Sequence, residues 1–515
     1  MRITIRADGN PTIGGGHVMR CLTMARAARG RGHEVAFVTA VGAGSFAGRI
    51  SAEGFTVAGI EPRAHDPSAD PEAPAHAGWL VTPWEEDAAV TAAAVAGQGA
   101  DWLVVDHYGL DARWTGRVRA AMPELRVLAI DDLDDRALGA DLVLDQTRMG
   151  GGSRRHSGLA NLTGPDYALL RPEFAAARPA ALSRRGQPVR RVLIAPGLAD
   201  AAGLAPLALD ALKGRPELSV DVVMGAESQS CGAVATRIAG REGAALHLDA
   251  TDMAGLMTRA DLCIGAGGMT GWERCCLGLP TVAVAVADNQ RPGLRGLSEA
   301  GAVVAMGLED ARMPGALTRA IGHAIETAQN LSVAAARLCD GQGAARVLDA
   351  LEGRFRPVTE ADARLLFDWR NRPEIRAVSL NRDELDWAKH VEWVRAMTRR
   401  TDGEWLIYAE GGRDLGHASA RDTGDGTWQW SFYIGEADAP KGAGGRMTAA
   451  FLRRLFAQPS VRAIRAEVVP GNAASEALHR RLGFRCVSEP DAGVLVFVAD
   501  RCDVRGRMGL PEEGH

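Results

Sequence analysis

The feature that most constrains this fold is a series of short, nearly wholly apolar segments that alternate with alanine-rich stretches. In the first 150 residues the segments are Arg2–Ala7, Glu34–Thr39, Trp102–Asp106, Arg126–Asp131 and Leu142–Asp145, and a first helix is predicted over Val18–Arg31. Such strands need apolar cover on both faces, and intervening helices favour parallel pairing. We therefore predict a parallel sheet between two helical layers, with ligands at the carboxyl ends of its strands.

Length, charge and cysteine content narrow the class of protein. A chain of 515 residues is too long for one core and predicts about three domains. The net charge of −5, without a basic tract, favours neither a nucleic-acid partner nor a membrane surface. The chain begins on a strand pattern and has no apolar run of about 18 residues, which favours a cytoplasmic protein. The eight cysteines lack metal-ligand spacing, so we expect no metal and no disulfide framework.

A glycine turn, Gly14-Gly15-Gly16, follows the first predicted strand and directly precedes His17. Glycines let the backbone approach a ligand, and a helix that begins near Val18 presents free N–H groups to negative charge. A histidine there can titrate near neutral pH. The pattern predicts a base beside an anion site. The alternative is a tight strand-to-helix turn in which His17 is an ordinary helix-start residue.

Polar residues also end two other strands of the predicted sheet. Asp106, His107 and Tyr108 close one strand, and Asp131-Asp132 close the next. Because carboxyl ends of parallel strands meet at one edge, we expect these residues and His17 on a common rim. The alternatives are helix capping for the aspartates and a satisfied polar pair for His107 and Tyr108.

Four motifs occur in a characteristic order: Arg6-Ala7-Asp8 with Gly14–His17 and Arg20, then Val105–Gly109, Asp131-Asp132, and Tyr167–Phe174. This order resembles the UDP-sugar hydrolases of pseudaminic acid biosynthesis over about residues 1–350. The resemblance implies a two-lobed glycosyltransferase-B-type fold. It also implies inverting, metal-independent release of UDP from UDP-2,4-diacetamido-2,4,6-trideoxy-β-L-altropyranose.

The resemblance implies roles for individual residues of the first lobe. His17 is expected to take a proton from the attacking water, while Tyr108 and Asp8 orient sugar and water. The other expected substrate contacts in this lobe are Arg6, Gly14, Gly15, Gly16 and His107.

A second run of strands and helices begins at Arg191–Ala195, after a basic, proline-broken stretch at 178–190 that is typical of a linker. Strand Asp261–Gly265 leads into Gly267, Gly268, Thr270 and Glu273, and the segment Leu277–Val286 leads into Asn289 and Gln290. The first turn can aim backbone amides at a diphosphate. By resemblance, Glu273 binds the ribose hydroxyls, and Asn289 and Gln290 contact sugar or phosphate. The alternative for Glu273 is a solvated acid in the first turn of a helix.

The last part of the chain changes character after a linker near Gly353–Pro357. The alternating strand Thr427–Ile434 precedes a glycine turn and an amphipathic helix to Phe456. The predicted strand Ala463–Val469 follows. After it comes the sequence motif Asn472…Leu478-His479-Arg-Arg-Leu482-Gly483-Phe484. This order resembles the GNAT N-acetyltransferases.

That resemblance implies acetyl-CoA as co-substrate, with its pyrophosphate held on backbone amides of the turn. The expected contacts are Lys441, Gly442, Ala443, Gly444, Gly445, Arg446 and Asn472. Ala439 stands where the family usually has Gln or Arg, and Lys441 or Arg446 could replace that side chain. His479 is expected to protonate the leaving thiolate, with packing on a helix face as the alternative.

We therefore predict an α/β chain with two Rossmann-like lobes of glycosyltransferase-B type, 1–177 and 190–350, and a GNAT domain at 354–510. The expected function is bifunctional: acetylation of a UDP-4-amino-sugar, and hydrolysis of the resulting UDP-diacetamido-sugar. Two alternatives stay open, a glycosyltransferase and a nucleotide-sugar sensor fused to a protein acetyltransferase. The sugar could also belong to the legionaminic acid route.

Overall fold

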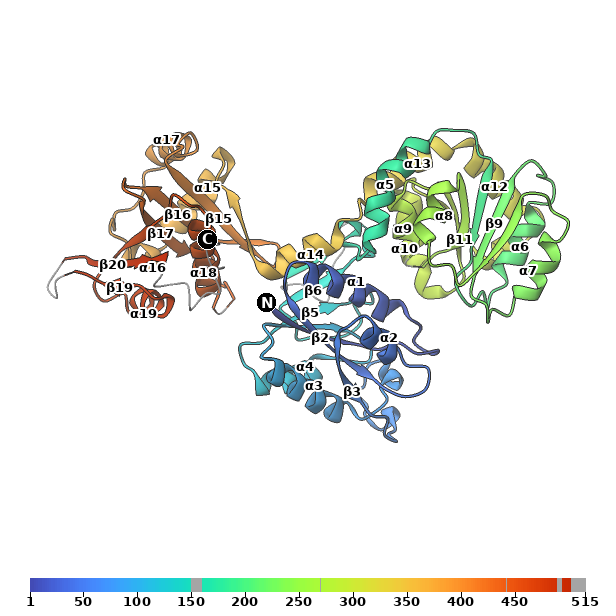
Figure 1. The fold of residues 1–515 in the computed structure, drawn as a ribbon, viewed down its shortest axis with the longest axis horizontal. Coiled ribbons are helices and arrows are strands. Elements are labelled where there is room, and N and C mark those ends of the chain that lie inside the picture. The colour runs from blue at the N-terminus through green and yellow to red at the C-terminus, as the bar shows by residue number, and fades with distance from the viewer. Residues whose placement is uncertain (150–159, 269, 441, 489–492, 502–515) are drawn as a thin grey trace, which may run out of the picture. The chain divides into compact units, whose positions relative to one another are not determined.

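The computed structural model describes residues 1–149, 160–268, 270–440, 442–488 and 493–501. The chain divides into two compact units, Met1–Leu348 and Asp349–His515 (Figure 1). The boundary falls within helix α14 (Gly343–Glu352). No helix in the described ranges combines the length and apolarity that a bilayer span requires.

The first unit contains two parallel sheets. The first sheet has the order β3 (Thr56–Ile60), β2 (Glu34–Ala40), β1 (Arg2–Ala7), β4 (Trp102–Asp106), β5 (Arg126–Ile130), β6 (Leu142–Asp145) and β7 (Ala160–Thr163). Every neighbouring pair is parallel. The helices of this lobe are α1 (Gly16–Gly30), α2 (Ala47–Ala52), α3 (Trp84–Gln98) and α4 (Ala112–Ala121), with short turns at η1 (Pro67–Ala69), η2 (Ala77–Trp79) and η3 (Pro165–Tyr167).

The strand order reverses between β1 and β4, which lie side by side in the middle of this sheet: β2 and β3 extend the sheet on one side, and β5 to β7 extend it on the other. Their register ends with Ala7 opposite Asp106, so the turn after β1 lies beside the carboxyl end of β4. In open α/β sheets such a switch point leaves a crevice between neighbouring loops, and ligands bind there. The first lobe therefore brings Asp8 and the turn before His17 next to Asp106, although about a hundred residues separate them in sequence.

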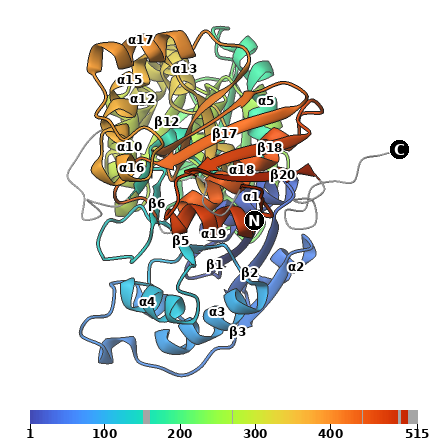
Figure 2. The ribbon, with the colours of Figure 1, turned by 90° about the vertical axis from the view of Figure 1, so that its left-hand side faces the viewer.

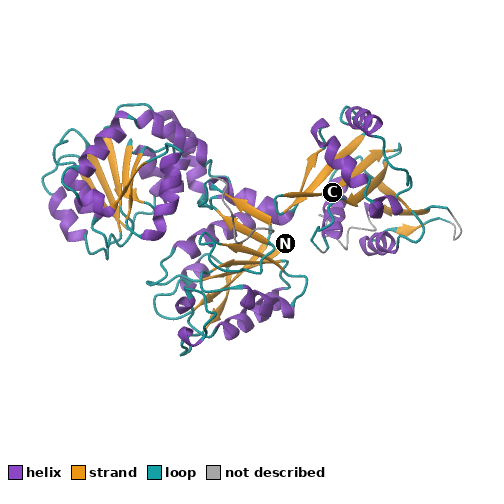
Figure 3. Ribbon diagram, turned by 180° about the vertical axis from the view of Figure 1, so that it is seen from behind, coloured by secondary structure: helices purple, strands orange, loops and turns teal. Residues whose placement is uncertain are grey.

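The second sheet repeats this order with different strands: β10 (Ala244–Leu248), β9 (Ser219–Met224), β8 (Arg191–Ala195), β11 (Leu262–Ala266), β12 (Thr281–Ala285) and β13 (Val304–Gly307). All of its pairs are parallel. Helices lie on both sides of its strands (Figure 3). They are α5 (Pro172–Arg184), α6 (Leu204–Ala211), α7 (Cys231–Ile238), α8 (Met253–Arg259), α9 (Thr270–Cys276), α10 (Arg291–Glu299), α11 (Leu308–Arg312), α12 (Ala316–Glu326) and α13 (Ala328–Leu338), with η4 (Asp288–Gln290).

Helix α5 differs from the linker predicted at 178–190. The helix continues through Arg184 although Pro179 lies inside it. Phe174 and Ala181 are buried in the core of the second sheet, and Arg178 donates to the carbonyl oxygens of Cys276, Cys339 and Ala336. Proline removes one helical hydrogen bond, but this packing outweighs the local preference.

The second unit is built on one mixed sheet with the order β14 (Arg354–Pro357), β15 (Gly403–Glu410), β16 (Arg413–Asp422), β17 (Thr427–Ile434), β18 (Ala463–Val468), β20 (Leu495–Asp500) and β19 (Arg485–Cys486). Only β17 and β18 pair in parallel. Its helices are α15 (Ala363–Arg370), α16 (Pro373–Ala377), α17 (Trp387–Met397), α18 (Ala443–Phe456) and α19 (Ala473–Leu482), with η5 (Glu360–Asp362). Figure 2 shows β17, β18 and β20 as neighbouring strands.

Strands β17 and β18 separate partway along their length. They pair from Thr427 to Trp430 of β17, after which β17 continues to Ile434 with β16 as its only partner. Successive residues of β17 face opposite sides of the sheet. Trp430 packs with Phe451 of α18, whereas Tyr433 packs in the cluster formed with α15 and α17. The separation opens the sheet between two helical layers.

The predicted fold class is confirmed: two parallel α/β sheets are followed by a mixed-sheet domain. The predicted strands of the first sheet agree with the structure to within one residue. Strands β3 and β7 at its two edges were missed. Edge strands are less apolar and carry a weaker signal, as Thr56–Ile60 illustrates.

Candidate active sites

His17 pairs with Asp106 where β1 and β4 end. Its Nδ1 atom lies 2.6 Å from Oδ1 of Asp106. An ionised carboxylate can only accept, so Nδ1 carries the proton and Nε2 keeps its lone pair. Nε2 forms no hydrogen bond with the described residues, and 10% of the His17 side chain stays accessible. Asp106 therefore engages Nδ1, and Nε2 is the nitrogen left to face a ligand.

Arg20 keeps the Asp106 carboxylate ionised. Its Nε and one terminal nitrogen donate to the two oxygens of Asp106, each over 2.6 Å. Burial raises the pKa of Asp106, but Arg20 and His17 lower it by more, so this pKa lies well below its usual range. Arg20 stands three residues after His17 in α1, on the same helix face. One helix thus supplies both the base and the cation that fixes its partner.

Tyr108 lies against His17 and is held by Asp132. Its hydroxyl donates a short hydrogen bond to Oδ1 of Asp132. Burial raises the pKa of Tyr108, so the phenol keeps its proton at neutral pH. The Tyr108 ring meets the His17 ring edge-on, with centroids 4.7 Å apart. The structure thus brings together His17 and Tyr108, which the sequence places 91 residues apart.

An aromatic wall borders this pair. The Trp79 ring, at the end of η2, lies 5.8 Å from that of His17 and 5.4 Å from that of Tyr108. His76 meets Trp79 at 4.8 Å. Trp79 is partly exposed, so one portion of a flat apolar ring remains available beside the base. Aromatic rings of this kind offer apolar contact area next to polar groups.

The start of α1 offers unpaired backbone N–H groups beside His17. The cap residue Gly15 has no side chain, and the first turn holds no acid. Gly14 has a positive φ of 80°, and a Cβ atom on Gly15 would lie 2.7 Å from the Phe46 ring. A Cβ atom on Gly16 would meet nothing within 4 Å. Gly14 and Gly15 are thus required by conformation and packing, whereas Gly16 faces open space at a helix end that favours anions.

Arg6, Asp8 and His107 form a buried network. The Arg6 side chain is 0% exposed and forms paired hydrogen bonds with Asp8 and Asp87. Asp8, 1% exposed, also accepts from the backbone N–H of Ala40 over 2.7 Å, and its Oδ2 lies 3.3 Å from Nε2 of His107. Burial raises the pKa of Asp8, but Arg6 and His107 lower it by more. Arg6 and Asp8 have their polar atoms committed inside the lobe, which argues against the predicted contacts with sugar and water.

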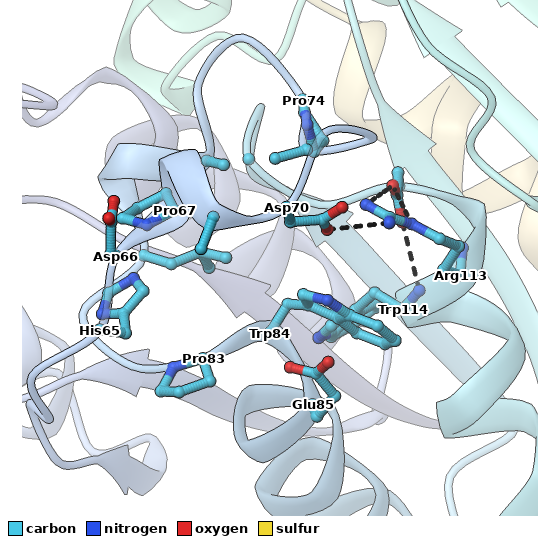
Figure 4. Close-up of a pocket in the computed structure, with 16 residues that line it drawn as sticks. His65, Asp66, Pro67, Asp70, Pro74, Pro83, Trp84, Glu85, Arg113 and Trp114 are labelled. Carbon is cyan, nitrogen blue, oxygen red and sulfur yellow. Dashed lines mark hydrogen bonds and ion pairs between the residues drawn. The ribbon is translucent and has the colours of Figure 1, made fainter.

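A separate hollow of about 320 Å³ lies in the first lobe among η1, α3 and α4 (Figure 4). The Arg113 guanidinium sits 5.4 Å from the Trp84 ring centre and pairs with Asp70 and Asp111 at 2.9 and 2.8 Å. Its cation is therefore satisfied by neighbouring carboxylates. None of the predicted site residues lines this hollow, and we do not place the reaction there.

In the second lobe, the predicted nucleotide residues follow β11 and β12. Glu273 on α9 accepts from Arg171 over 3.2 Å, and burial raises the pKa of Glu273. The Thr270 hydroxyl accepts from Arg274 over 3.3 Å, and the Gln290 side-chain oxygen accepts from the N–H of Val286 over 3.1 Å. Gln290 keeps its amide nitrogen for a ligand. The Asn289 side chain lies outside the described part of the structure.

The two glycines after β11 differ in how much room a side chain would have at each position. A Cβ atom on Gly267 would lie 2.4 Å from Leu294 of α10. Packing against α10 is therefore sufficient to require glycine at position 267. A Cβ atom on Gly268 would meet only the Gln290 amide, at 4.0 Å. Gly268 and the Gln290 amide thus lie close to each other.

The second unit holds a cavity of about 1060 Å³ along the separation of β17 and β18. Its walls include Gly444, Asn472 and His479 from the α18 and α19 side, and Arg370 and His417 from the opposite side. Helix α18 begins after Gly442, which has a positive φ of 79° and no capping side chain, and its first turn contains no acid. The cavity therefore ends at a helix start with free backbone donors.

The predicted side-chain contacts around this helix start are mostly engaged within the protein. Arg446 donates to both oxygens of Glu410 over 2.9 and 2.8 Å. The Asn472 oxygen accepts from the N–H of Ser475 over 3.1 Å and caps α19. Lys441 lies outside the described residues. The N–H of Ala443 donates to the carbonyl oxygen of Pro440 over 3.0 Å, so the N–H groups of Gly444 and Gly445 remain the anion donors of this turn.

His479 has both ring nitrogens engaged. Nδ1 lies 2.7 Å from the carbonyl oxygen of Ser475, which can only accept. Nε2 accepts from the Trp430 indole over 3.2 Å. Burial lowers the pKa of His479, which is 2% exposed, and favours this neutral form. A neutral imidazole has one N–H, and here it points at a carbonyl, so the geometry favours packing over proton donation to a thiolate.

Sequence reasoning missed Trp79, assigned no role to Arg20 or Asp132, and did not pair His17 with Asp106. Arg20 carried a usable signal, because a residue three positions after His17 shares its helix face. The pairing with Asp106 depends on β1 and β4 being neighbours, which periodicity does not reveal. No group of three or more potential metal ligands occurs among the described residues.

Comparison with known proteins gives partial matches. Residues 354–485 match the family model described as acetyltransferase (GNAT) domain. The spore coat polysaccharide biosynthesis protein SpsG of Bacillus subtilis is 32% identical over 148 residues, which are 28% of this chain and 43% of that protein. This chain therefore spans less than half the length of that relative.

Two crystal structures are also similar. MurG of Acinetobacter baumannii is 16% identical, with a TM-score of 0.49, over 68% of this chain and 98% of its own. Aminoglycoside acetyltransferase AAC(6')-Ib in complex with coenzyme A is 21% identical, with a TM-score of 0.27, over 30% of this chain and 98% of its own. Together with the family match, the mixed sheet establishes a GNAT acetyltransferase domain in the second unit.

Proposed function

We propose that this chain is a bifunctional nucleotide-sugar enzyme of pseudaminic acid biosynthesis. The first unit would hydrolyse UDP-2,4-diacetamido-2,4,6-trideoxy-β-L-altropyranose to UDP and free sugar. The second unit would transfer acetyl from acetyl-CoA to the 4-amine of the preceding UDP-amino-sugar. The observation that carries the first activity is the His17–Asp106 pair, because it leaves a neutral imidazole nitrogen free beside an uncapped helix start. The relative named for polysaccharide biosynthesis supports a sugar substrate.

In this mechanism, His17 Nε2 takes a proton from water as the oxygen attacks the anomeric carbon opposite UDP. Asp106 stabilises the imidazolium that forms, since its carboxylate accepts the Nδ1 proton at 2.6 Å. Tyr108, whose hydroxyl proton is donated to Asp132, accepts a hydrogen bond from a sugar hydroxyl, and Trp79 supplies an apolar face. A single displacement of this kind inverts the anomeric carbon.

The leaving UDP carries its charge on two phosphates, and the protein offers backbone donors for them. Gly268 and the Gln290 amide nitrogen lie close together on this side of the lobe and are the groups we assign to the phosphates. Glu273, buried beside Arg171, can accept from ribose hydroxyls. These residues bind the nucleotide while His17 performs the proton transfer.

For the acetyltransferase, the cavity between β17 and β18 can hold the acetyl-bearing arm of the co-substrate. The first turn of α18 binds its pyrophosphate on the backbone N–H groups of Gly444 and Gly445. The substrate amine attacks the thioester directly, the C–N bond forms, the C–S bond breaks, and sulfur ends with a proton. No covalent enzyme intermediate is needed.

The decisive experiment follows UDP release from the diacetamido sugar nucleotide by phosphorus NMR. We expect UDP and free sugar without added acceptor, and His17→Ala should slow release by about 10²–10⁴-fold with UDP affinity nearly unchanged. Acetyl transfer should be unaffected in the same variant. Wild-type turnover in His17→Ala would remove the base from the mechanism.

The assay also separates the alternative functions. A glycosyltransferase would release UDP only when an acceptor sugar is added. A nucleotide-sugar sensor would bind the compound and release no UDP under either condition. Running the legionaminic-type diacetamido sugar in parallel tests the configuration, because the matched epimer should show the higher kcat/KM.

A further inference from the structure

His417 is a buried histidine in the cavity of the second unit without a hydrogen-bond partner. It lies on β16, is 6% exposed, and lines the cavity of about 1060 Å³. Its Nε2 atom is buried and unpaired, and no hydrogen bond joins either ring nitrogen to the described residues. Buried polar groups in native proteins are nearly always satisfied, so an exception in a cavity indicates a missing ligand.

The other histidines of this cavity are hydrogen-bonded to protein atoms. Nε2 of His390 on α17 donates to the carbonyl oxygen of Ala363 over 3.0 Å. His479 has partners at both nitrogens. Among the three cavity histidines, only His417 has no hydrogen bond to the described residues, and its Nε2 is buried without a partner.

The neighbours of His417 place it beside the part of the sheet where β17 and β18 have separated. It lies directly opposite Tyr433 in the β16–β17 register, with ring centroids 5.4 Å apart. Tyr433 stands three residues beyond Trp430, the last residue of β17 that pairs with β18. His417 is therefore level with the opened part of the sheet, on the face covered by α15 and α17.

We propose that His417 is the general base of acetyl transfer, accepting the proton of the attacking amine. This inference rests on the acetyltransferase activity proposed above. The amine binds with one N–H directed at a ring nitrogen of His417, and its lone pair attacks the thioester carbon. As the C–N bond forms, that proton passes to His417. The C–S bond then breaks, the thiolate takes a proton from solvent, and His417 returns its own proton to solvent.

Burial supports this assignment by keeping the ring neutral. It lowers the pKa of His417 to about 4, so the imidazole is uncharged at neutral pH and can accept a hydrogen bond from the start. The titratable side chains that line the same cavity are Arg370 on α15, Glu374 on α16, Lys389 and His390 on α17, Asp383, Glu384 and Asp386 before α17, Tyr433 on β17, Glu467 on β18 and His479 on α19.

The test compares His417→Gln with His390→Gln in the full chain. Acetyl transfer from acetyl-CoA to the UDP-4-amino-sugar is measured together with acetyl-CoA affinity and thermal unfolding. We expect kcat of His417→Gln to fall by about 10²–10⁴-fold with acetyl-CoA affinity within about twofold of wild type. His390→Gln, a matched change of a cavity histidine whose Nε2 is bonded to Ala363, should retain most of kcat.

A second variant keeps the proposal testable if glutamine disturbs the sheet. In His417→Ala, added imidazole should restore part of kcat, which a purely structural role does not predict. Equal kcat values for wild type and a folded His417→Gln would overturn the proposal. Loss of acetyl-CoA binding together with kcat would also overturn it, because the residue would then be structural.

The same assay separates this inference from the proposed substrate. If wild type acetylates a lysine peptide but not the UDP-amino-sugar, the substrate assignment fails, while the effect of His417→Gln on the peptide still decides the role of the base. A wild-type chain that acetylates neither amine would overturn both.

Discussion

At the scale of single residues, function in the first lobe depends on one pair. His17 alone on a helix start is an ordinary residue, and Asp106 alone is an ordinary strand end. Their contact at 2.6 Å, with Arg20 on the same carboxylate, defines the tautomer and directs the free nitrogen outward. The proposed base therefore depends on three side chains together, those of His17, Asp106 and Arg20.

The pair gives a direct prediction. Asp106→Asn should reduce UDP release by about 10²–10⁴-fold, because the amide can present its N–H to the histidine and favour the wrong tautomer. The double variant with His17→Ala should be no slower than His17→Ala alone, since the residues act as a unit. Additive losses in single-turnover kinetics would show that Asp106 acts independently of His17.

Glu273 gives a second residue-scale prediction, with a control supplied by its own neighbour. Glu273→Ala should weaken UDP binding by about 1–3 kcal/mol, the cost of leaving ribose hydroxyls unpaired. Glu173 also pairs with Arg171, at 3.0 Å, but is exposed. Glu173→Ala should leave UDP affinity in calorimetry unchanged. Equal effects of the two substitutions would indicate that both act through Arg171.

At the scale of elements, local sequence predicted what depends on local physics. The sequence patterns predicted five strands of the first sheet, three of the second (β8, β11 and β12) and two of the third (β17 and β18), and the glycine turns preceding α1, α9 and α18 were located correctly. The other strands of the second and third sheets were missed. Strand order was not encoded in those patterns, so the contact between His17 and Asp106 was missed. Helix α5 extends to Arg184, where a linker was predicted because proline usually ends a helix. Here the helix continues past Pro179, because tertiary packing outweighs that preference. The hydrogen bond that occupies Nε2 of His479 comes from Trp430, which lies 49 residues away in sequence.

Helix α18 supplies an element-scale prediction. A Cβ atom on Gly444 would lie 3.5 Å from Ile434, an ordinary contact, and this glycine lines the cavity. Gly444→Val should therefore fold yet lose at least about tenfold in acetyl-CoA affinity, because branched side-chain atoms enter the anion-binding turn. Gly116→Ala on α4, where a Cβ atom meets nothing within 4 Å, is the control. Unchanged acetyl-CoA binding in Gly444→Val would move the pyrophosphate elsewhere.

At the scale of the whole molecule, the second unit has its own sheet and its own cores. A hydrogen bond between the N–H of Gly411 and the carbonyl oxygen of Ala350 ties the end of α14 to that unit. Gly353 follows with a positive φ of 71°, and a Cβ atom there would lie 2.2 Å from the Tyr408 hydroxyl. The natural start of the unit therefore precedes the strand at Arg354.

This arrangement predicts how the chain can be divided. A fragment that begins at Asp349 should fold alone and transfer acetyl groups, and it should be more stable than one that begins at Arg354. The difference should be about 1 kcal/mol or more in urea unfolding, since the shorter fragment lacks the Ala350 hydrogen bond and the buried Leu351. Equal stability of the two fragments would show that α14 contributes nothing to this unit.

The separation of β17 from β18 leaves the protein with a sheet that is unfinished without its co-substrate. Backbone amides of Ser431–Ile434 that point away from β16 have no strand to bond with. Any extended ligand that carries amide groups, as the arm of acetyl-CoA does, can take the place of the absent neighbour. Hydrogen–deuterium exchange at these amides should therefore be fast in the free protein and slow once the co-substrate is added, so the backbone itself reports occupancy of the site.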